Sequence, residues 1–424
     1  MCRGQILIQE WLLDAVIQSR SNKSWTTRIP IINLPTSETT TSLLSNAKVV
    51  LPECVSEKAA LLIEGGLITQ VFDAQATLPK ADSVVDLQGA TLFPGFIDVH
   101  IHGAVGVDTM EANAADLVRL SKFLASQGVT GWLPTLVPGP VADYELAIRA
   151  IREASDSNEG ARIFGVHYEG PFVNSAQCGA LRTSYFRTYS GSPDVSDLPV
   201  LTNPNLKHMM TVAPEVQGGV ALTRELTSRG WIVSVGHTRA QFDLLDQVFE
   251  AGARHMTHFM NAMSPLHHRA PGPVAWGLLR DEVTCDFIAD GVHLDPQILK
   301  LLLKTKTPNH LTMISDSVAA AGLGDGDYQI WGETIRVKDG RTSNSAGSIA
   351  GSVISMLDAV RLMKEVGASD LEVSKMASGN PARLLSLDSE CGSIGEGKRA
   401  DLVVLDQDGK VRLTIVGGQL VHGK

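Results

Sequence analysis

The chain has 424 residues, of which 44% are hydrophobic and 19% are charged, so it can bury a sizeable core and wholesale disorder is excluded. A formal net charge of −10 argues against a nucleic-acid partner or an anionic membrane, because both select a basic face. The five cysteines are scattered without a CxxC pair, no long apolar run is present, and the start has no signal-peptide pattern. These features predict a cytoplasmic protein with reduced thiols.

The two ends of the chain differ from its middle in their pattern of apolar, Gly and Pro residues. Residues 1–46 are predicted to be a poorly ordered N-terminal extension, with a short amphipathic helix at 6–17 and a flexible Ser/Thr-rich linker at 36–45. Short β-like runs split by Gly and Pro fill residues 47–93 and return at 388–424. We predict that these two segments pair into one small β-sandwich domain that the long middle interrupts.

The middle, residues 94–387, alternates strand and helix patterns. Eight strands are predicted at Phe96–Gly103, Val129–Val137, Arg162–Gly170, His208–Ala213, Ile232–Thr238, His255–Met260, Cys285–Val292 and Leu311–Val318. Helical spacing of apolar residues is found at Ala114–Gln127, Val141–Ala154, Val220–Ser228, Gln241–Ala251 and Pro296–Lys304. Eight βα units predict a (β/α)8 TIM-like barrel. A doubly wound sheet is the alternative, but no GxGxxG follows a first strand. Residues 328–345 look like a hairpin insertion.

The first predicted strand carries a His-x-His pair. Because side chains alternate along a strand, Asp98, His100 and His102 share one face. Two neighbouring imidazoles are costly to bury unpaired and suit a divalent metal. Taken alone, the pair fits two partly exposed histidines without a function equally well.

Further candidate ligands stand where other predicted strands end. His100 and His102 end the first strand, Glu169 the third, His237 the fifth, His258 the sixth, His293 the seventh and Asp316 the eighth. The carboxyl ends of barrel strands converge on one mouth, where barrel active sites lie. The joint pattern predicts a metal site at that mouth.

The residue types fit a hydrolytic centre. Imidazoles and a carboxylate hold Zn²⁺ or Fe²⁺ and leave a position for water, whose pKa the ion lowers. Asp316 can accept the proton of that water and pass it to a leaving amine. The predicted reaction is hydrolysis of an amide, a lactam or an amidine. Cys178 and Cys285 do not look like ligands, because they fall in a loop and in a buried strand.

Seven motifs stand in order along the chain: PGFIDVHIHG (94–103), HYEGPF (167–172), VGHT (235–238), HFMNAM (258–263), ADGVH (289–293), SDSVAAAG (315–322) and GSIGEGKRADLVVLD (392–406). Together they resemble the amidohydrolase superfamily and, more narrowly, the N-acetylglucosamine-6-phosphate deacetylase family, from about Ala47 to the C-terminus. The first and last motifs occur across the superfamily, whereas EGPF and H-x-x-NAM are narrower.

The resemblance implies a metal-dependent hydrolase that converts N-acetylglucosamine 6-phosphate to glucosamine 6-phosphate and acetate in amino-sugar catabolism. It implies that Glu169, His237 and His258 hold the main divalent metal, with Zn²⁺ preferred and Fe²⁺ as the alternative. It implies that a second metal can bind His100 and His102 and share Asp316, the catalytic acid and base.

The resemblance also implies a substrate site, a small phosphorylated amino sugar as the partner, and a homodimer. The implied substrate-binding residues are Gly179, Ala180, Asn261, Ala262, Arg269, His293, Ile349, Ala350, Gly351 and Ser352. His293 would polarise the substrate, and Asn261, Ala262 and Arg269 would meet the phosphate, for which a planar multi-donor arginine is suited.

One loop departs from the family pattern. The family usually has a basic residue followed by Gly-Ala-His, and this chain reads Cys178-Gly179-Ala180-Leu181. An unphosphorylated N-acetyl amino sugar or another amide therefore stays open as the substrate. A binding protein without activity is disfavoured because every implied ligand is present. His255 is predicted to be structural, since it lies on the opposite strand face from His258.

Overall fold

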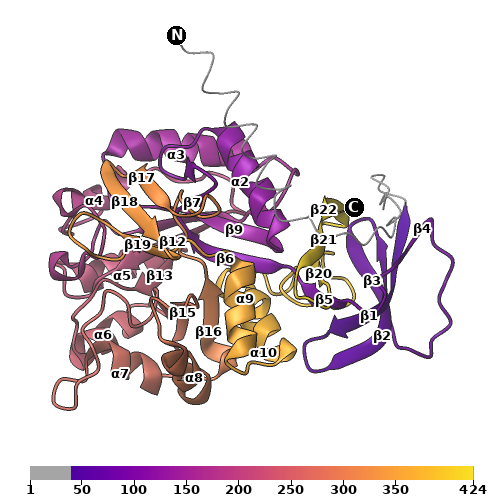
Figure 1. Cartoon of the computed structure of the whole chain (residues 1–424). Coiled ribbons are helices and arrows are strands. Elements are labelled where there is room, and N and C mark those ends of the chain that lie inside the picture. The colour runs from indigo at the N-terminus through magenta and orange to yellow at the C-terminus, as the bar shows by residue number, and fades with distance from the viewer. Residues whose placement is uncertain (1–39, 424) are drawn as a thin grey trace, which may run out of the picture. The chain divides into compact units, whose positions relative to one another are not determined.

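The structure, a computed structural model, describes residues 40–423 (Figure 1). The helix predicted at 6–17 and the first part of the predicted linker lie outside the described residues. Within residues 40–423, no helix combines the length and the apolar composition needed to cross a bilayer.

The middle of the chain forms a parallel barrel with eight strand positions. The strands are β6 (Phe96–Ile101), β9 (Val129–Leu136), β10 (Arg162–Ile163) followed by β11 (Gly165–Glu169), β12 (Lys207–Val212), β13 (Ile232–Val235), β14 (His255–Met256), β15 (Thr284–Ile288) and β16 (Leu311–Ile314). Each strand pairs with the next position along the chain. The barrel closes where the main-chain N–H of Asp316 donates to His100 O at 2.9 Å and that of His102 donates to Ser317 O at 2.8 Å. The predicted barrel and its eight strands are confirmed.

Several strands are shorter than predicted, and β14 is the clearest case. It ends at Met256, whereas the strand was predicted to continue to Met260. His258 and Met260 adopt left-handed backbone, with φ of +31° and +76°, so the chain turns away from the sheet there. This turn carries His258 into the mouth of the barrel.

Helices surround the barrel strands (Figure 1). The five predicted helices are found as α2 (Ala114–Ser126), α3 (Val141–Ala154), α5 (Gly219–Ser228), α6 (Phe242–Glu250) and α8 (Pro296–Thr305). The other α-helices in residues 40–423 are α4 (Pro193–Ser196), α7 (Gly272–Leu279), α9 (Met356–Glu365), α10 (Asp370–Ser374) and α11 (Asn380–Leu384). α2 shows why the pattern works, because Leu117, Leu120 and Leu124 are buried on one face and Asn113 forms a capping box. α7 was not predicted because its sequence is apolar on nearly every side and gives no periodicity.

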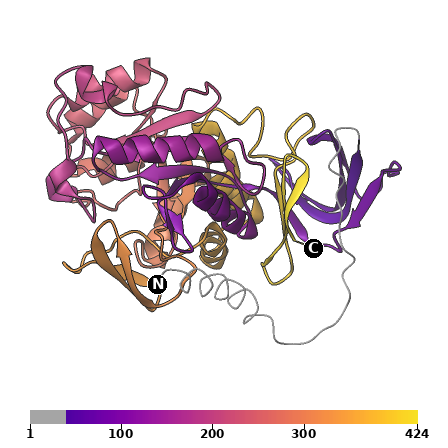
Figure 2. The same cartoon turned by 90° about the horizontal axis from the view of Figure 1, so that it is seen from above.

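The predicted hairpin insertion is present and contains a third strand. β17 (Gly326–Ile330), β18 (Glu333–Lys338) and β19 (Arg341–Ser343) form their own antiparallel sheet, drawn in orange in Figures 1 and 2. Trp331 and Gly332 make the tight turn between β17 and β18, both with positive φ.

The two ends of the chain pair into one eight-stranded sheet, which confirms their predicted association. Its strands are β1 (Thr41–Val50), β2 (Val55–Glu64), β3 (Leu67–Phe72), β4 (Ser83–Asp86), β5 (Thr91–Pro94), β20 (Leu402–Leu405), β21 (Val411–Val416) and β22 (Gln419–Gly423). The join is the antiparallel pair β5–β20, in which Pro94 faces Leu402. Figures 1 and 2 show the indigo and yellow strands side by side.

The predicted start of this sheet at residue 47 is wrong. β1 begins at Thr41, so residues 41–46 belong to a strand and not to a flexible linker. Leu43 and Leu44 are buried there, and Ser42 pairs with Ile63 of β2. The Ser/Thr-rich composition hid a strand because hydroxyl side chains are also common on sheets.

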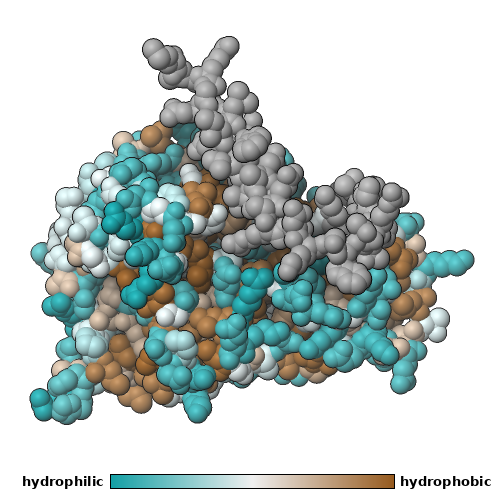
Figure 3. Space-filling view, viewed as in Figure 1, coloured by the Kyte–Doolittle hydropathy of each residue, from teal (hydrophilic) through white to brown (hydrophobic). Residues whose placement is uncertain are grey.

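The core of the described chain is a large cluster of buried apolar side chains around the barrel strands, including Phe96, Trp132, Tyr168 and Phe287. The face seen in Figure 3 is mostly hydrophilic, with apolar patches between. Because the core around the barrel strands is packed, the side chains at the strand ends are held in fixed positions.

Candidate metal centre

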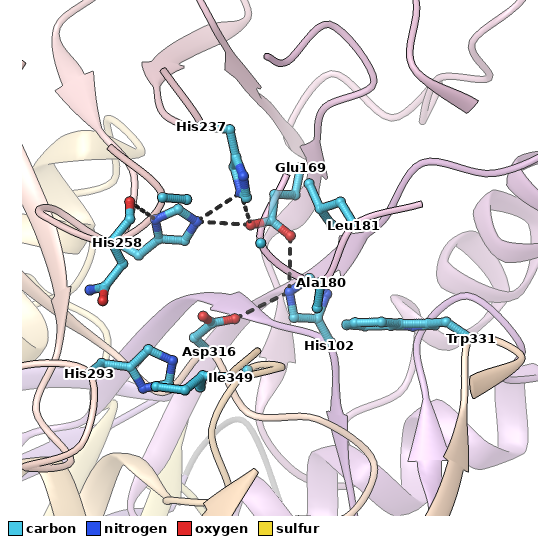
Figure 4. A pocket seen from close by; sticks show the side chains of 14 residues that line it. His102, Glu169, Ala180, Leu181, His237, His258, His293, Asp316, Trp331 and Ile349 are labelled. Atoms are coloured by element: carbon cyan, nitrogen blue, oxygen red, sulfur yellow. Dashed lines mark hydrogen bonds and ion pairs between the residues drawn. The ribbon is translucent and has the colours of Figure 1, made fainter. Parts of the chain in front are cut away.

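The candidate ligands from six barrel positions converge on one pocket (Figure 4). The pocket is lined by His102, Glu169, His237, His258, His293 and Asp316 among its fourteen residues. His100 lies directly behind this lining and is fully buried, with its Nε2 atom 3.4 Å from Asp316 Oδ1. The structure therefore brings together all seven strand-end residues.

Glu169, His237 and His258 form the first cluster. Glu169 Oε1 lies 2.9 Å from His237 Nε2 and 3.0 Å from His258 Nε2, and the two Nε2 atoms are 3.0 Å apart. Ligand atoms bound to one ion at ~2.0–2.2 Å have separations of this size. All three side chains are buried.

The outer hydrogen bonds of the two histidines test whether a cation fits. His237 Nδ1 lies 2.7 Å from the main-chain oxygen of Gln177, and His258 Nδ1 lies 3.2 Å from that of Asn261. A carbonyl oxygen only accepts, so each Nδ1 carries the proton and each Nε2 presents a lone pair. Two lone pairs and a carboxylate oxygen facing one another repel unless a cation lies between them. The donor set therefore fits a divalent metal.

His100, His102 and Glu169 form a second cluster beside the first. His102 Nε2 lies 3.3 Å from Glu169 Oε2 and 3.2 Å from Asp316 Oδ1, and it is 3.2 Å from His100 Nε2. The two oxygens of Glu169 thus face different clusters. This arrangement has the donors for two neighbouring ions that share one carboxylate.

Burial and charge favour the metal-binding form at Glu169 and His100. Burial alone would raise the pKa of Glu169, but the surrounding histidines hold it well below its usual range. Burial lowers the pKa of His100 well below that of a free imidazole. A carboxylate that stays ionised and an imidazole that stays neutral are the protonation states that ligate a metal. Burial would lower the pKa of His102 and of His258, but the neighbouring carboxylates Glu169 and Asp316 raise these values to about 10 and about 9, so an ion would displace a proton from each ring.

The backbone at three of the strand ends is strained. His237, His258 and Asp316 have φ values of +47°, +31° and +48°, a region that non-glycine residues seldom occupy. Such conformations cost about 1–3 kcal/mol each and cluster at functional sites. Here they turn the side chains from the end of each strand into the pocket.

Residues below the pocket support the ligands, and most were not predicted. His167 is buried between the hydroxyls of Thr135 and Thr211, at 3.2 and 2.8 Å. Asp286 accepts a hydrogen bond from the main-chain N–H of His258, and its other oxygen lies 3.1 Å from His255 Nε2. His255 has no part in either cluster. His167 shares its strand face with Glu169, and this period-two spacing is the signal that could have found it.

His293 reaches the pocket from the loop after β15. Its Nδ1 atom lies 2.7 Å from Asp290 Oδ2, and Asp290 Oδ1 accepts the main-chain N–H groups of Val292 and His293 at 2.8 Å. Burial would raise the pKa of Asp290, but these partners lower it below its usual value. The Nε2 atom of His293 is left for a ligand in the pocket.

The implied substrate residues divide into three groups. Those that line the pocket are Gly179, Ala180, Asn261, Ala262, His293, Ile349 and Gly351. Ala350 and Ser352 are buried behind it, and the Ser352 N–H donates to Asp316 O at 2.7 Å. Arg269 is exposed, has its Nη1 atom 2.8 Å from His268 Nε2, and does not line the pocket.

The lining also includes Leu181, from the loop that departs from the family pattern, and Trp331, which was not expected there. Leu181 is 7% exposed and contributes to the wall formed by the loop after β11. Trp331, at the tip of the β17–β18 hairpin, is 9% exposed and places its ring edge-on to that of His102, with 5.1 Å between the centroids. No local pattern in the sequence could place a hairpin tip in a pocket on the barrel.

Comparison with known proteins agrees with this geometry. The amidohydrolase family model matches residues 91–421. The N-acetylglucosamine-6-phosphate deacetylase of Bacillus subtilis is 34% identical over 388 residues, which cover 89% of this chain and 96% of that protein. The N-acetylgalactosamine-6-phosphate deacetylase of Escherichia coli O157:H7 is 34% identical over 344 residues, or 81% of this chain and 90% of that protein.

A solved structure supports the same assignment. The N-acetylglucosamine-6-phosphate deacetylase of Thermotoga maritima superposes with a TM-score of 0.81 and is 34% identical, covering 90% of this chain and 100% of that one. The barrel fold, the metal-ligand donors in the pocket and the similarity to these relatives over most of the chain all support one assignment. The chain therefore belongs to the amidohydrolase family, within the group that contains the N-acetylglucosamine-6-phosphate deacetylases.

Proposed function

We propose that this enzyme hydrolyses the acetamide of N-acetylglucosamine 6-phosphate to glucosamine 6-phosphate and acetate. The observation that carries the proposal is the position of Asp316, whose Oδ1 atom lies 3.2 Å from His102 Nε2 at the floor of a pocket with two metal-binding clusters. Relatives about one-third identical over most of the chain catalyse this deacetylation by name. We take residues 94–387 as the catalytic domain.

The divalent ion implied by the family would polarise the acetyl carbonyl and lower the pKa of a water molecule at Glu169, His237 and His258. Asp316 takes a proton from the attacking water as its oxygen bonds to the acetyl carbon. When the carbon–nitrogen bond breaks, Asp316 returns that proton to the leaving nitrogen. Acetic acid and the free amine are the direct products. Loss of the remaining proton from the acid to the amine gives acetate and the ammonium form, so atoms and charge balance.

His293 stabilises the charge that develops on the acetyl oxygen. Its Nδ1–H is directed at Asp290 Oδ2 at 2.7 Å, so donation from Nε2 to the acetyl oxygen uses the doubly protonated ring. A charged donor aimed at a developing oxyanion is worth a factor of about 10²–10³ in rate.

The loop Cys178–Leu181 and the loop at 349–351 provide the remaining contacts. Gly179 and Gly351 have positive φ and line the pocket, so main chain approaches the substrate closely there. Asn261 and Ala262 lie at the same mouth. We assign Arg269 to the phosphate from its neighbouring position on the exposed loop after this turn, where a flexible guanidinium can reach an anion at the rim.

Zn²⁺ is the proposed metal at the first cluster, because two imidazoles and one carboxylate are a common catalytic zinc set. A homodimer and a cytoplasmic location are proposed on the same family basis. The four described cysteines are unpaired, which supports a reducing compartment. Metal analysis and light scattering test the first two assignments.

Other substrates compete with the proposed one for two specific reasons. The 34% identical relative from Escherichia coli O157:H7 acts on the galactosamine epimer by name. Leu181 and the exposed Arg269 leave the pocket described here without an arginine or a lysine in its lining, which favours an unphosphorylated sugar as the third candidate.

One assay separates these candidates. Acetate release is measured from N-acetylglucosamine 6-phosphate, N-acetylgalactosamine 6-phosphate and N-acetylglucosamine, before chelation, after chelation and after zinc is restored. We expect metal-dependent turnover of the phosphorylated glucosamine derivative with the highest kcat/KM. Higher kcat/KM for either other sugar would move the substrate and keep the chemistry. No turnover of any of them by metal-loaded enzyme would overturn the proposal.

A further inference from the structure

Asp108 lies beside the metal-binding pair His100 and His102, although no motif pointed to it. A two-stranded ladder of β7 (Gly103–Ala104) and β8 (Val107–Asp108) places Asp108 directly opposite Gly103. The next residue, Thr109, donates its main-chain N–H to His102 O at 2.9 Å. Asp108 is therefore held one residue from a candidate ligand by the backbone itself.

Three polar atoms in this corner are buried and have no hydrogen-bond partner. They are His102 Nδ1, Asp108 Oδ2 and Trp331 Nε1. The rings of His102 and Trp331 meet edge to face, with an interplanar angle of 80°. Figure 4 shows the two side chains next to each other. Burial raises the pKa of Asp108 to about 6, and the Met110 N–H, His102 and the Trp331 indole act against that rise.

The donors and acceptors in the corner are complementary. When His102 uses Nε2 toward an ion, its Nδ1 carries a proton and must donate. Trp331 Nε1–H also donates, and Asp108 Oδ2 only accepts. The other oxygen, Oδ1, already accepts the Met110 N–H at 2.9 Å. A buried donor or acceptor that is left unpaired is destabilising, so the metal-bound state gains stability by joining them.

We propose that Asp108 is the positioning residue of His102: its Oδ2 atom accepts the Nδ1–H of His102 and holds Nε2 toward the second metal position. Trp331 closes this pair off from solvent and donates to the remaining lone pair of the same oxygen. The inference rests on the two-ion site of the proposed function. It links the hairpin tip to the second cluster, and the first cluster has its own outer partners in Gln177 and Asn261.

The test is the metal affinity of Asp108→Asn. Because the Asn oxygen keeps the Met110 N–H, its NH₂ group faces the His102 Nδ1–H, and a donor meets a donor. Zn²⁺ is titrated into metal-free protein against a chromophoric chelator, and bound zinc is counted by mass spectrometry. We expect two ions per wild-type chain, with the weaker ion bound about 10–100-fold less tightly in the variant. The tighter ion should keep its affinity within a factor of about two.

Two further variants act as controls. Glu111→Gln removes an exposed carboxylate three residues away and should leave both affinities unchanged. Asp108→Ala removes the acceptor without adding a donor, so it should weaken the second ion less than Asn does. It also gives the answer if Asp108→Asn fails to fold, which thermal unfolding of the metal-free proteins detects.

The proposal would be overturned if the folded Asp108 variants bound each ion as tightly as wild type does. It would also be overturned if the wild-type chain became saturated with one ion. Failure of the proposed function is recognised separately. In that case wild type would release no acetate from the sugar phosphates, while Asp108→Asn would still lose the second ion.

Discussion

His237 donates its Nδ1–H to the main-chain oxygen of Gln177 across 2.7 Å, which ties a candidate metal ligand to the loop that precedes Cys178–Leu181. The same loop is anchored again where Asn174 N–H donates to His237 O at 3.1 Å. Because Gly179, Ala180 and Leu181 line the pocket, the wall that meets the substrate and a ligand of the first cluster are positioned together.

Glu215 accepts hydrogen bonds from both the loop before Cys178 and the segment after His237. It accepts from Asn174 Nδ2 at 2.6 Å, from Thr238 Oγ1 at 2.5 Å and from the Arg239 N–H at 2.6 Å. Glu215→Ala leaves these donors without an acceptor and frees the His237 loop. We expect a fall of about 10–100-fold in first-ion affinity and in kcat/KM. Chelator competition and acetate release measure the two effects.

The matched control for Glu215 is Glu225→Ala. Glu225 bonds Arg229 on the outer side of α5, away from the pocket. Its loss should leave metal binding and turnover unchanged. If the two variants bind zinc equally well, Glu215 has no part in holding His237.

Asp316→Asn tests the proton transfer. The amide keeps the shape of the side chain but can neither accept the proton of water nor return it to nitrogen. We expect kcat to fall by about 10²–10⁴-fold with the ion at Glu169, His237 and His258 retained. Near wild-type turnover by metal-loaded variant enzyme would mean that another group moves the proton.

Gly351→Ala tests how tightly Asp316 is supported from the neighbouring loop. A methyl group on Gly351 would lie 2.6 Å from Val318 Cγ1 and 2.9 Å from Asp316 O, and its φ is +60°. Gly347 has a φ of +80° in the same loop, but a methyl group there meets no atom within 4 Å.

Both glycine variants therefore pay the strain of a left-handed alanine, about 1 kcal/mol, and only Gly351→Ala adds a steric clash with the residue that carries the proton. We expect Gly347→Ala to retain kcat and Gly351→Ala to lose at least tenfold. Thermal unfolding and kcat are the two measurements. Equal kcat values would show that this contact does not position Asp316.

His208 predicts a pH dependence of stability that is separate from catalysis. Its Nε2 atom accepts the Leu201 N–H at 2.9 Å, its ring stacks on Trp231, and burial lowers its pKa from 6.5 to about 4. Between these values the unfolded chain binds a proton that the folded chain does not. The free energy of unfolding therefore falls as the pH drops from about 6.5 to 4, by at most about 1.4 kcal/mol per unit.

His208→Asn should remove this part of the acid sensitivity, so the variant loses less stability than wild type between pH 6.5 and 4. Chemical denaturation at several pH values measures the slope. His268→Asn, at an exposed position, is the control and should keep the wild-type slope. An unchanged slope in His208→Asn would contradict the prediction.

The sequence was most informative where local periodicity decides the structure. Alternation along β6 places His100 and His102 on one face, and the ends of parallel strands must meet, so the convergence of Glu169, His237 and Asp316 could be predicted. The supporting residues could not. Gln177 acts through a main-chain oxygen and Asp108 through a side chain held by a two-residue ladder, and neither role leaves a mark on residue type or spacing.

Long-range contacts, which local sequence patterns do not record, also explain the errors in the predicted fold. β1 begins at Thr41 because Leu43 and Leu44 find partners on β2, a long-range contact that outweighs the linker-like composition. The path of Trp331 into the pocket depends on where a whole hairpin lies, which no window of neighbouring residues records.

The hairpin of β17, β18 and β19 makes its ladder bonds within itself, yet it contributes Trp331 to the pocket lining. Such a piece can vary in length or sequence during evolution without disturbing a barrel strand. Selectivity can then drift through Trp331 and its neighbours while the ligands stay fixed. Exchange of this segment between related enzymes is thus a direct route to new amino-sugar preferences on an unchanged catalytic barrel.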